Sequence, residues 1–80
     1  MTVTVRLFAS YAERLGHSSL SIELPAGSRV KDAVTSLRNM PGGSMLPPTP
    51  LVAINRGYAS PDSALSEGDE LAVIPPVAGG

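Results

Sequence analysis

The sequence predicts an α+β fold, in which one main helix covers one face of a mixed sheet. Three observations support this fold class. Apolar residues alternate in two N-terminal segments, a helical repeat follows, and two further apolar segments precede the final glycines. The chain has 80 residues, of which 42% are hydrophobic, so we expect one small domain with a mainly aliphatic core.

The first strand is predicted over residues 2–8, where apolar and polar side chains alternate. The side chains expected to face the core are Val3, Val5 and Leu7. Phe8, the only phenylalanine, falls on the opposite face. One face of this strand is therefore predicted to be buried.

A short helix and a second strand are expected next. Ser10 is a candidate N-cap for a helix over residues 11–15, which Gly16 ends. Alternation returns at residues 20–24 and stops at Pro25. The short connection favours antiparallel pairing of this strand with the first.

The main helix is predicted after Ser28, a second candidate N-cap. Apolar residues follow at positions i, i+3, i+4 and i+7 of a helical stripe, namely Val30, Ala33, Val34 and Leu37. Residues 39–50 contain four prolines and two glycines. We expect them to form a connection that tolerates insertions rather than a functional surface.

The remaining elements are a strand at 51–55, a turn at 55–57, a short strand at 58–59, a helical turn at 60–65, a tight turn at 66–69 and a final strand at 70–74. Two hairpin-like pairs therefore flank a helical crossover. The right-handed crossover rule places the first and last strands side by side and parallel in the centre. This arrangement is the β-grasp, with a domain at 1–74 and a flexible tail at 75–80.

The tail is the strongest candidate site. It reads Pro75-Pro76-Val77-Ala78-Gly79-Gly80, and its prolines end the strand while its glycines can pass through a narrow channel. Six extended residues reach roughly 20 Å. If the tail is functional, its reactive atom is the α-carboxyl carbon of Gly80; the alternative is a frayed terminus.

One main helix covers only one sheet face, which predicts an apolar surface on the other. The candidates for this surface are Phe8, Ile74, and either Leu51 with Ala53 or Val52 with Ile54. We interpret it as a docking surface for a partner. The alternative is that the short segment 10–15 and the proline-rich loop fold over it.

Composition disfavours several function classes. Six basic and seven acidic residues give a net charge of −1, with no basic stripe for nucleic acid. The absence of cysteine excludes disulfides and thiolate metal sites, and His17 receives no role. No segment approaches the ~20 apolar residues of a membrane span, and no signal peptide is evident. A cytoplasmic protein is expected.

Several segments resemble the MoaD family, the small sulfur-carrier subunits of molybdopterin synthase. The matching segments are residues 5–9, 13–16, 52–55 and 65–70, and above all 69–80, where an apolar strand runs into Pro-Pro-Val-Ala-Gly-Gly. Val73 and Ile74 stand where such proteins often have aromatic residues. The resemblance covers nearly the whole chain and implies a ubiquitin-like β-grasp.

The resemblance implies a cycle of activation and transfer. A MoeB-like enzyme uses ATP to adenylate Gly80, and a sulfur donor protein replaces AMP to leave a thiocarboxylate (1-thioglycine). A MoaE-like large subunit then receives this sulfur for cyclic pyranopterin monophosphate. The tail residues implied to enter a partner channel are Pro75, Pro76, Val77, Ala78 and Gly79. Phe8 and Ile74 would lie at the partner interface.

In this interpretation the chain binds no cofactor or metal, is not catalytic alone and works in a hetero-oligomer. It contains neither a phosphate-binding loop nor a nucleophile–base pair. Three alternatives remain open: a ThiS-like sulfur carrier for another pathway, a ubiquitin-like protein modifier, and an interaction domain with an inert tail. The single lysine, Lys31, argues mildly against chains built by self-conjugation.

Overall fold

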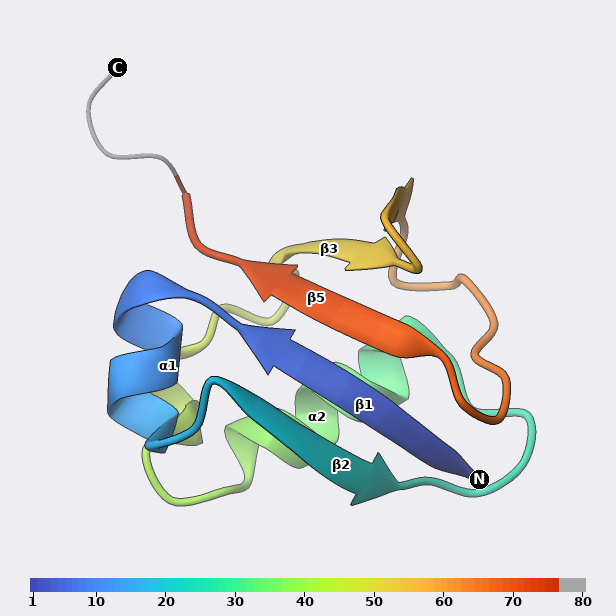
Figure 1. Ribbon diagram of the computed structural model, residues 1–80, viewed down its shortest axis with the longest axis horizontal. Coiled ribbons are helices and arrows are strands. Elements are labelled where there is room, and N and C mark those ends of the chain that lie inside the picture. Colours follow the sequence, from blue (N-terminus) through green and yellow to red (C-terminus); the bar gives the residue numbers. More distant parts are fainter. Residues whose placement is uncertain (77–80) are drawn as a thin grey trace.

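The computed structural model describes residues 1–76, which form a five-stranded sheet, two α-helices and a short 3-10 helix (Figure 1). The elements in chain order are β1 (Thr2–Leu7), α1 (Ala9–Leu15), β2 (Ser19–Glu23), α2 (Val30–Arg38), η1 (Gly43–Met45), β3 (Leu51–Ile54), β4 (Gly57–Ala59) and β5 (Glu70–Ile74). The predicted tail residues Val77, Ala78, Gly79 and Gly80 lie outside the described residues.

The sheet has the strand order β2-β1-β5-β3-β4. The neighbours β1 and β5 are parallel, with Val5 opposite Leu71, while the other three pairs are antiparallel. The final strand therefore lies in the middle of the sheet beside the first strand, as the crossover rule predicts. The α+β β-grasp fold is confirmed.

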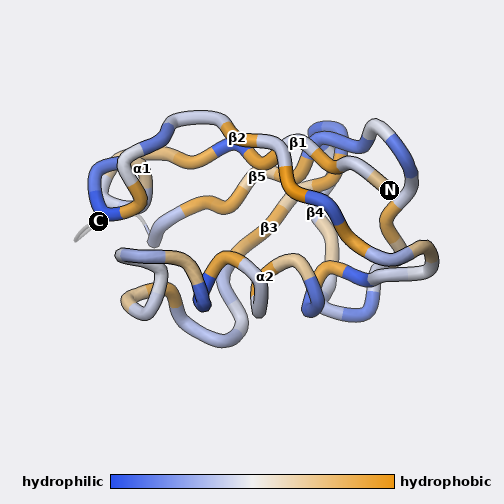
Figure 2. Tube along the Cα trace, turned by 90° about the horizontal axis from the view of Figure 1, so that it is seen from below, coloured by the Kyte–Doolittle hydropathy of each residue, from blue (hydrophilic) through white to orange (hydrophobic). Residues whose placement is uncertain are grey.

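The core lies between the sheet and α2. Figure 2 shows this layered arrangement, with hydrophobic residues along the strands. The inward side chains of the two central strands are buried, as are the four stripe residues of α2; they are Val3, Val5, Leu7, Leu71, Val73, Val30, Ala33, Val34 and Leu37. The periods of two and 3.6 in the sequence therefore identify the buried faces correctly.

Helix α1 begins two residues earlier than the sequence suggests, at Ala9 rather than residue 11. Its N-cap is Phe8, whose extended backbone (φ −130°, ψ 153°) turns into the helix and whose carbonyl accepts from Tyr11 N–H at 3.0 Å. Ser10 lies within the first turn, so its expected capping role is wrong. Gly16 ends the helix in the left-handed region, with φ 76°, as expected.

Helix α2 is also capped differently from the prediction. Its N-cap is Arg29, whose N–H donates to the Asp32 carboxylate at 2.8 Å. The Ser28 hydroxyl instead donates to the carbonyl of Pro25 at 2.7 Å and is buried in the preceding turn. Ser28 is therefore not the cap, because its hydroxyl is used one turn earlier.

The helical turn predicted at residues 60–65 is absent from the described fold. This segment forms turns and then a β-bridge between Ala64 and Arg29. The N–H groups of Val30 and Lys31 donate to the carbonyls of Ser63 and Pro61, at 3.0 and 2.9 Å. Pairing with the first turn of α2 replaces a local helix, since that turn has unsatisfied N–H groups.

The loop between α2 and β3 is packed over its first half. An added Cβ at Gly43 would lie 1.8 Å from the carbonyl oxygen of Leu37, and one at Gly42 would lie 2.1 Å from that of Arg14. Leu46, which follows η1, is only 1% exposed. We therefore expect insertions to be tolerated only at the exposed residues 47–49.

Candidate functional site

The candidate site is the sheet face opposite α2. Strand register aligns outward-facing residues in one row that crosses four strands. Arg6 is opposite Ala72, Ala72 is opposite Ala53, and Ala53 is opposite Tyr58. Two alanines therefore occupy the middle of a row that larger side chains flank.

A hollow of about 410 Å³ lies over these alanines. Its lining residues are Phe8, Ala53, Arg56, Tyr58, Ala72 and Ile74. The alanine side chains end at Cβ, which leaves space between larger neighbours. Phe8 is 42% exposed and Tyr58 is 81% exposed, so two aromatic rings are available to a partner.

The structure brings the two predicted interface residues, Phe8 and Ile74, together in this hollow. It also shows which of the two possible residue pairs of β3 faces outward. Val52 is buried in the core, whereas Ala53 lines the hollow and Leu51 is 51% exposed. The outward pair is therefore Leu51 with Ala53. Their role in partner binding stays a prediction.

The proline-rich loop covers only one side of this face. A second hollow, of about 300 Å³, lies where the loop meets the end of β5. Its lining residues are Tyr11, Pro47, Thr49, Pro50, Leu51, Ile74 and Pro76. Within the described part of the chain, neither α1 nor this loop lines the hollow at Phe8. The alternative, in which the helix and the loop fold over the apolar face, therefore applies to only part of that face.

The position of β5 determines where the tail leaves the domain. β5 ends at Ile74, and the chain then leaves the sheet (Figure 1). Ile74 lines both hollows, and the half-buried Pro75 and the exposed Pro76 follow it. Because β1 and β5 are parallel, Phe8 emerges from the same end of the sheet. The docking face and the base of the tail are therefore adjacent.

Sequence reasoning missed Arg56, Tyr58 and Ala72. The period of two in the last strand places Ala72 on the face of Ile74. The position of Arg56 and Tyr58 instead depends on the β3–β4 hairpin, whose turn has φ 48° at Asn55 and 74° at Arg56. The sequence signal that could have located these two residues was the Asn-Arg-Gly turn after an apolar strand, which predicts a hairpin.

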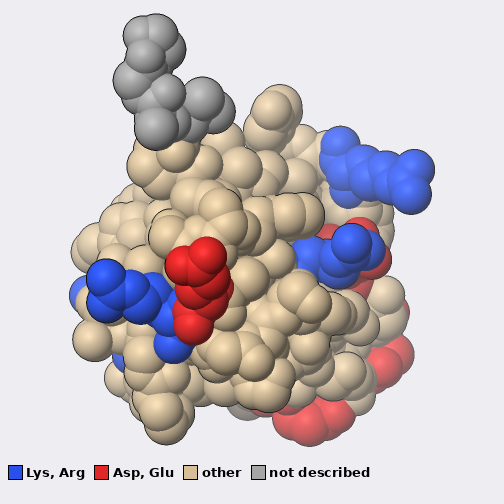
Figure 3. All heavy atoms as spheres, turned by 60° about the vertical axis from the view of Figure 1, so that its left-hand side comes forward, with Lys and Arg blue, Asp and Glu red and all other residues tan. Residues whose placement is uncertain are grey.

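Charges on this side of the molecule are spaced apart. Figure 3 shows basic and acidic side chains scattered among uncharged ones rather than gathered in a stripe of one sign. Arg6 Nη1 lies 3.7 Å from Glu70 Oε2 on the outer sheet face. In residues 1–76, no group of three or more His, Asp or Glu side chains could hold a metal ion.

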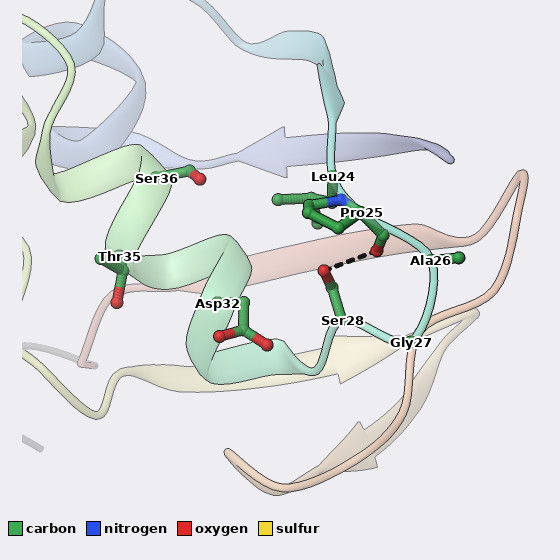
Figure 4. A pocket seen from close by; sticks show the side chains of 8 residues that line it. All are labelled: Leu24, Pro25, Ala26, Gly27, Ser28, Asp32, Thr35 and Ser36. Carbon is green, nitrogen blue, oxygen red and sulfur yellow. Dashed lines mark hydrogen bonds between the residues drawn. The ribbon is translucent and has the colours of Figure 1, made fainter.

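A separate hollow of about 340 Å³ lies beside the start of α2 (Figure 4). Residues 24–28 of the preceding loop form one side, and Asp32, Thr35 and Ser36 form the other. The Asp32 carboxylate already accepts from the N–H of Arg29. This hollow is at the opposite end of the strands from the base of the tail, so we do not assign it to the tail's chemistry.

Comparison with known proteins identifies the family. Residues 5–80 match the model of the ThiS family. The molybdopterin synthase sulfur carrier subunit of Chlamydomonas reinhardtii is 32% identical over 83 residues, covering 100% of both chains. The protein of the same name from Arabidopsis thaliana is 30% identical over 79 residues, covering 98% of this chain and 82% of the relative.

Solved structures agree with the sequence relatives. SAMP1 from Haloferax volcanii has a TM-score of 0.85 at 28% identity, with 100% of both chains covered. A putative molybdopterin converting factor subunit 1 from Pyrococcus furiosus has a TM-score of 0.83 at 28% identity, covering 96% of this chain and 99% of that one. In the described residues, no helix is long and apolar enough to span a membrane. The chain belongs to the ThiS family, and the expected resemblance to the MoaD sulfur carriers is confirmed.

Proposed function

We propose that this protein is the sulfur-carrier subunit of a molybdopterin synthase. The observation that supports this most is similarity over essentially the whole chain to proteins of that name. The family match also extends through Gly79 and Gly80. The proposed reactive group is therefore inside the matched region.

The proposed chemistry is confined to the carboxylate of Gly80. A carboxylate is a poor electrophile because its leaving group would be an oxide. Attack of its oxygen on the α-phosphorus of ATP releases pyrophosphate and gives an acyl-adenylate. A hydrosulfide equivalent from a donor protein then adds to the carbonyl carbon and expels AMP. The product is a thiocarboxylate, which needs no cysteine in the carrier.

The domain presents this group and the partners supply catalysis. The prolines at 75 and 76 cannot donate N–H groups to a further strand pair, so they separate the tail from β5. Glycines at 79 and 80 have no side chain that would block a channel. The apolar face beside Phe8 provides a place for a partner to hold the domain while the tail reaches into an active site.

Three partners follow from this cycle: a MoeB-like adenylating enzyme, a sulfur donor protein and a MoaE-like large subunit. The large subunit would take sulfur from Gly80 and transfer it to cyclic pyranopterin monophosphate. We propose a hetero-oligomer of carrier and large subunit. We also propose a cytoplasmic location, where ATP is available for activation.

Intact mass of the protein purified from its native host tests the proposal. The expected mass exceeds that of the unmodified chain by the difference between one sulfur and one oxygen atom. Fragmentation should locate this difference at Gly80. A mass that stays unmodified when the demand for cofactor is high would contradict the proposal.

A protein modifier is the second candidate. The specific observation in its favour is the similarity to a Haloferax volcanii protein named small archaeal modifier protein 1, with a TM-score of 0.82 at 27% identity. Both functions begin with the same acyl-adenylate. In a modifier, a target lysine amine would attack the carbonyl carbon and expel AMP. Lysine-linked conjugates in native extracts would favour this candidate over the sulfur carrier.

A further inference from the structure

Resting on the function proposed above, we propose that Arg56, on the outer sheet face, is a specificity-determining residue for the large subunit. In the complex, the hollow over Ala53 and Ala72 holds one apolar side chain of that subunit. The Arg56 guanidinium pairs with a carboxylate beside it.

Arg56 is the cation at this hollow that has no ionic partner within residues 1–76. It is exposed and lines the hollow. The neighbouring cation, Arg6, lies 3.7 Å from Glu70. Among the described residues, the ion pairs of side chains are those of Arg6 with Glu70 and Lys31 with Asp62. Arg56 therefore stays available for a carboxylate from outside the domain.

The two acidic residues that bond to the adjoining Asn55, Asp69 and Glu70, have other partners for their carboxylates. Asp69 accepts from the side-chain amide of Asn55 at 3.0 Å and from the N–H of Ser66 at 2.8 Å. Glu70 faces Arg6. The Asp69 carboxylate therefore stabilises the turns beside β5, and the Glu70 carboxylate lies beside Arg6, so neither is paired with Arg56.

The hairpin turn holds Arg56 in place. Arg56 has a left-handed backbone, with φ 74°, and follows Asn55, with φ 48°. The Asn55 side chain connects this turn to β5, because its oxygen accepts from Glu70 N–H and its amide donates to Asp69, both at 3.0 Å. The Asn55 N–H also donates to the Glu70 carbonyl at 2.9 Å. A turn fixed in this way loses little entropy when it binds.

The hollow and the arginine suit one kind of contact. Arg56 lies beside Tyr58, and these are the residue types that dominate binding energy at protein interfaces. The alanine floor is apolar and has space for one side chain. The complementary surface is therefore an apolar residue with an acidic residue next to it.

A second copy of this chain does not provide that surface. A two-fold interface centred on the hollow would place the same patch on both sides. The Arg56 side chains would then approach one another, and like charges disfavour such a contact. The relatives are named as subunits of a synthase, which implies a lasting interface with another subunit. The large subunit is therefore the occupant that we propose.

Calorimetric titration of the full-length chain into the large subunit from the same organism tests this contact. Arg56→Glu should weaken binding by about tenfold, and Arg56→Asn by about threefold at low salt. Asparagine tolerates the left-handed backbone, so this variant retains the turn. Ala72→Leu should also weaken binding, because it fills the hollow. The effect of Arg56→Glu should decrease when salt is raised, which a purely structural role would not produce.

Lys31→Glu is the matched control. It changes the net charge by the same amount on α2, which covers the opposite sheet face, and its affinity should stay within about twofold of wild type. Thermal melts confirm that each variant is folded. If Arg56→Glu binds as well as Lys31→Glu, or if Ala72→Leu binds as well as wild type, the proposed contact is wrong while the proposed function stands.

Two further outcomes identify a different occupant. If Arg56→Glu binds the large subunit normally but is adenylated poorly, the contact belongs to the activating enzyme and the inference is overturned. If Arg56→Glu instead changes self-association in sedimentation, a second copy is the occupant and the inference is also overturned. If the wild-type chain does not bind the large subunit, the proposed function and this inference both fail.

Discussion

Phe8 lies between β1 and α1 and contributes to two features, the start of the helix and the outer hollow. It is the N-cap residue of α1, and its partly exposed ring lines the hollow beside Ile74. The capping role uses only backbone atoms, since the Phe8 carbonyl accepts from the first turn of the helix. The ring can therefore be removed without removing the hydrogen bonds that start α1.

Phe8→Ala should weaken binding to the large subunit more than it weakens folding. Complete burial of the ring by a partner would contribute ~1.5–3 kcal/mol. The loss of folding stability should be smaller, since 42% of the residue's surface is already exposed in the free protein. Calorimetry and urea denaturation measure the two effects. Unchanged affinity would mean that the ring lies outside the interface.

Gly79→Leu and deletion of Gly80 should abolish sulfur transfer without destabilising the domain. A leucine side chain would block a channel that fits glycine, and the deletion shortens the tail by about 3.5 Å, so that the terminal carboxylate, now on Gly79, falls short of the partner's active site. Both positions follow the last strand, so unfolding stability should change by less than about 0.5 kcal/mol. Transfer is measured with purified partners after activation. Transfer that persists after the deletion would contradict the proposed chemistry.

At the scale of elements, hydrophobic spacing predicted more than polar residues did. The stripe of α2 and the alternation of β1 identified the buried faces, and the same alternation placed Phe8 on the outer face. The capping roles of Ser10 and Ser28 were wrong because a hydroxyl has several possible acceptors, and the folded chain decides between them. Ser28 bonds to Pro25 for this reason.

Longer-range contacts explain the other differences at this scale. Residues 60–65 pair with the start of α2 across a large separation in sequence, which local patterns do not encode. The outer hollow likewise depends on register between β3, β4 and β5. The sequence placed Phe8 and Ile74 on one face, but it did not predict that Arg56 lies beside the same hollow.

The loop after α2 gives a direct test of packing at this scale. Gly43→Ala should destabilise the fold by about 1–3 kcal/mol, because its Cβ would overlap the Leu37 carbonyl and the backbone must move. Gly57→Ala is the matched control. The nearest atom to its added Cβ, among the contacts described, is the Ile54 carbonyl oxygen at 3.6 Å. Equal denaturation midpoints for the two variants would show that the loop adjusts freely.

For the whole molecule, the sheet order connects folding to function. The strand that precedes the tail, β5, is paired on both edges, with β1 and with β3. The buried residues Leu71 and Val73 add core contacts on its inner face. A small domain has few such residues, so removal of either one affects the entire fold. The tail therefore has a rigid base even though the domain is small.

This arrangement predicts a hierarchy of hydrogen exchange across the sheet. Amides in the middle of β5 should exchange only through global unfolding, because their partners on both sides must separate first. Amides of β4, a three-residue edge strand, should exchange through local opening at a lower free energy. Leu71→Ala should reduce the protection of β5 and β1 together, by about 2–5 kcal/mol. Exchange followed by NMR measures each amide. Faster exchange in β5 than in β4 would mean that the base of the tail opens locally, and that the domain does not hold it rigidly for its partners.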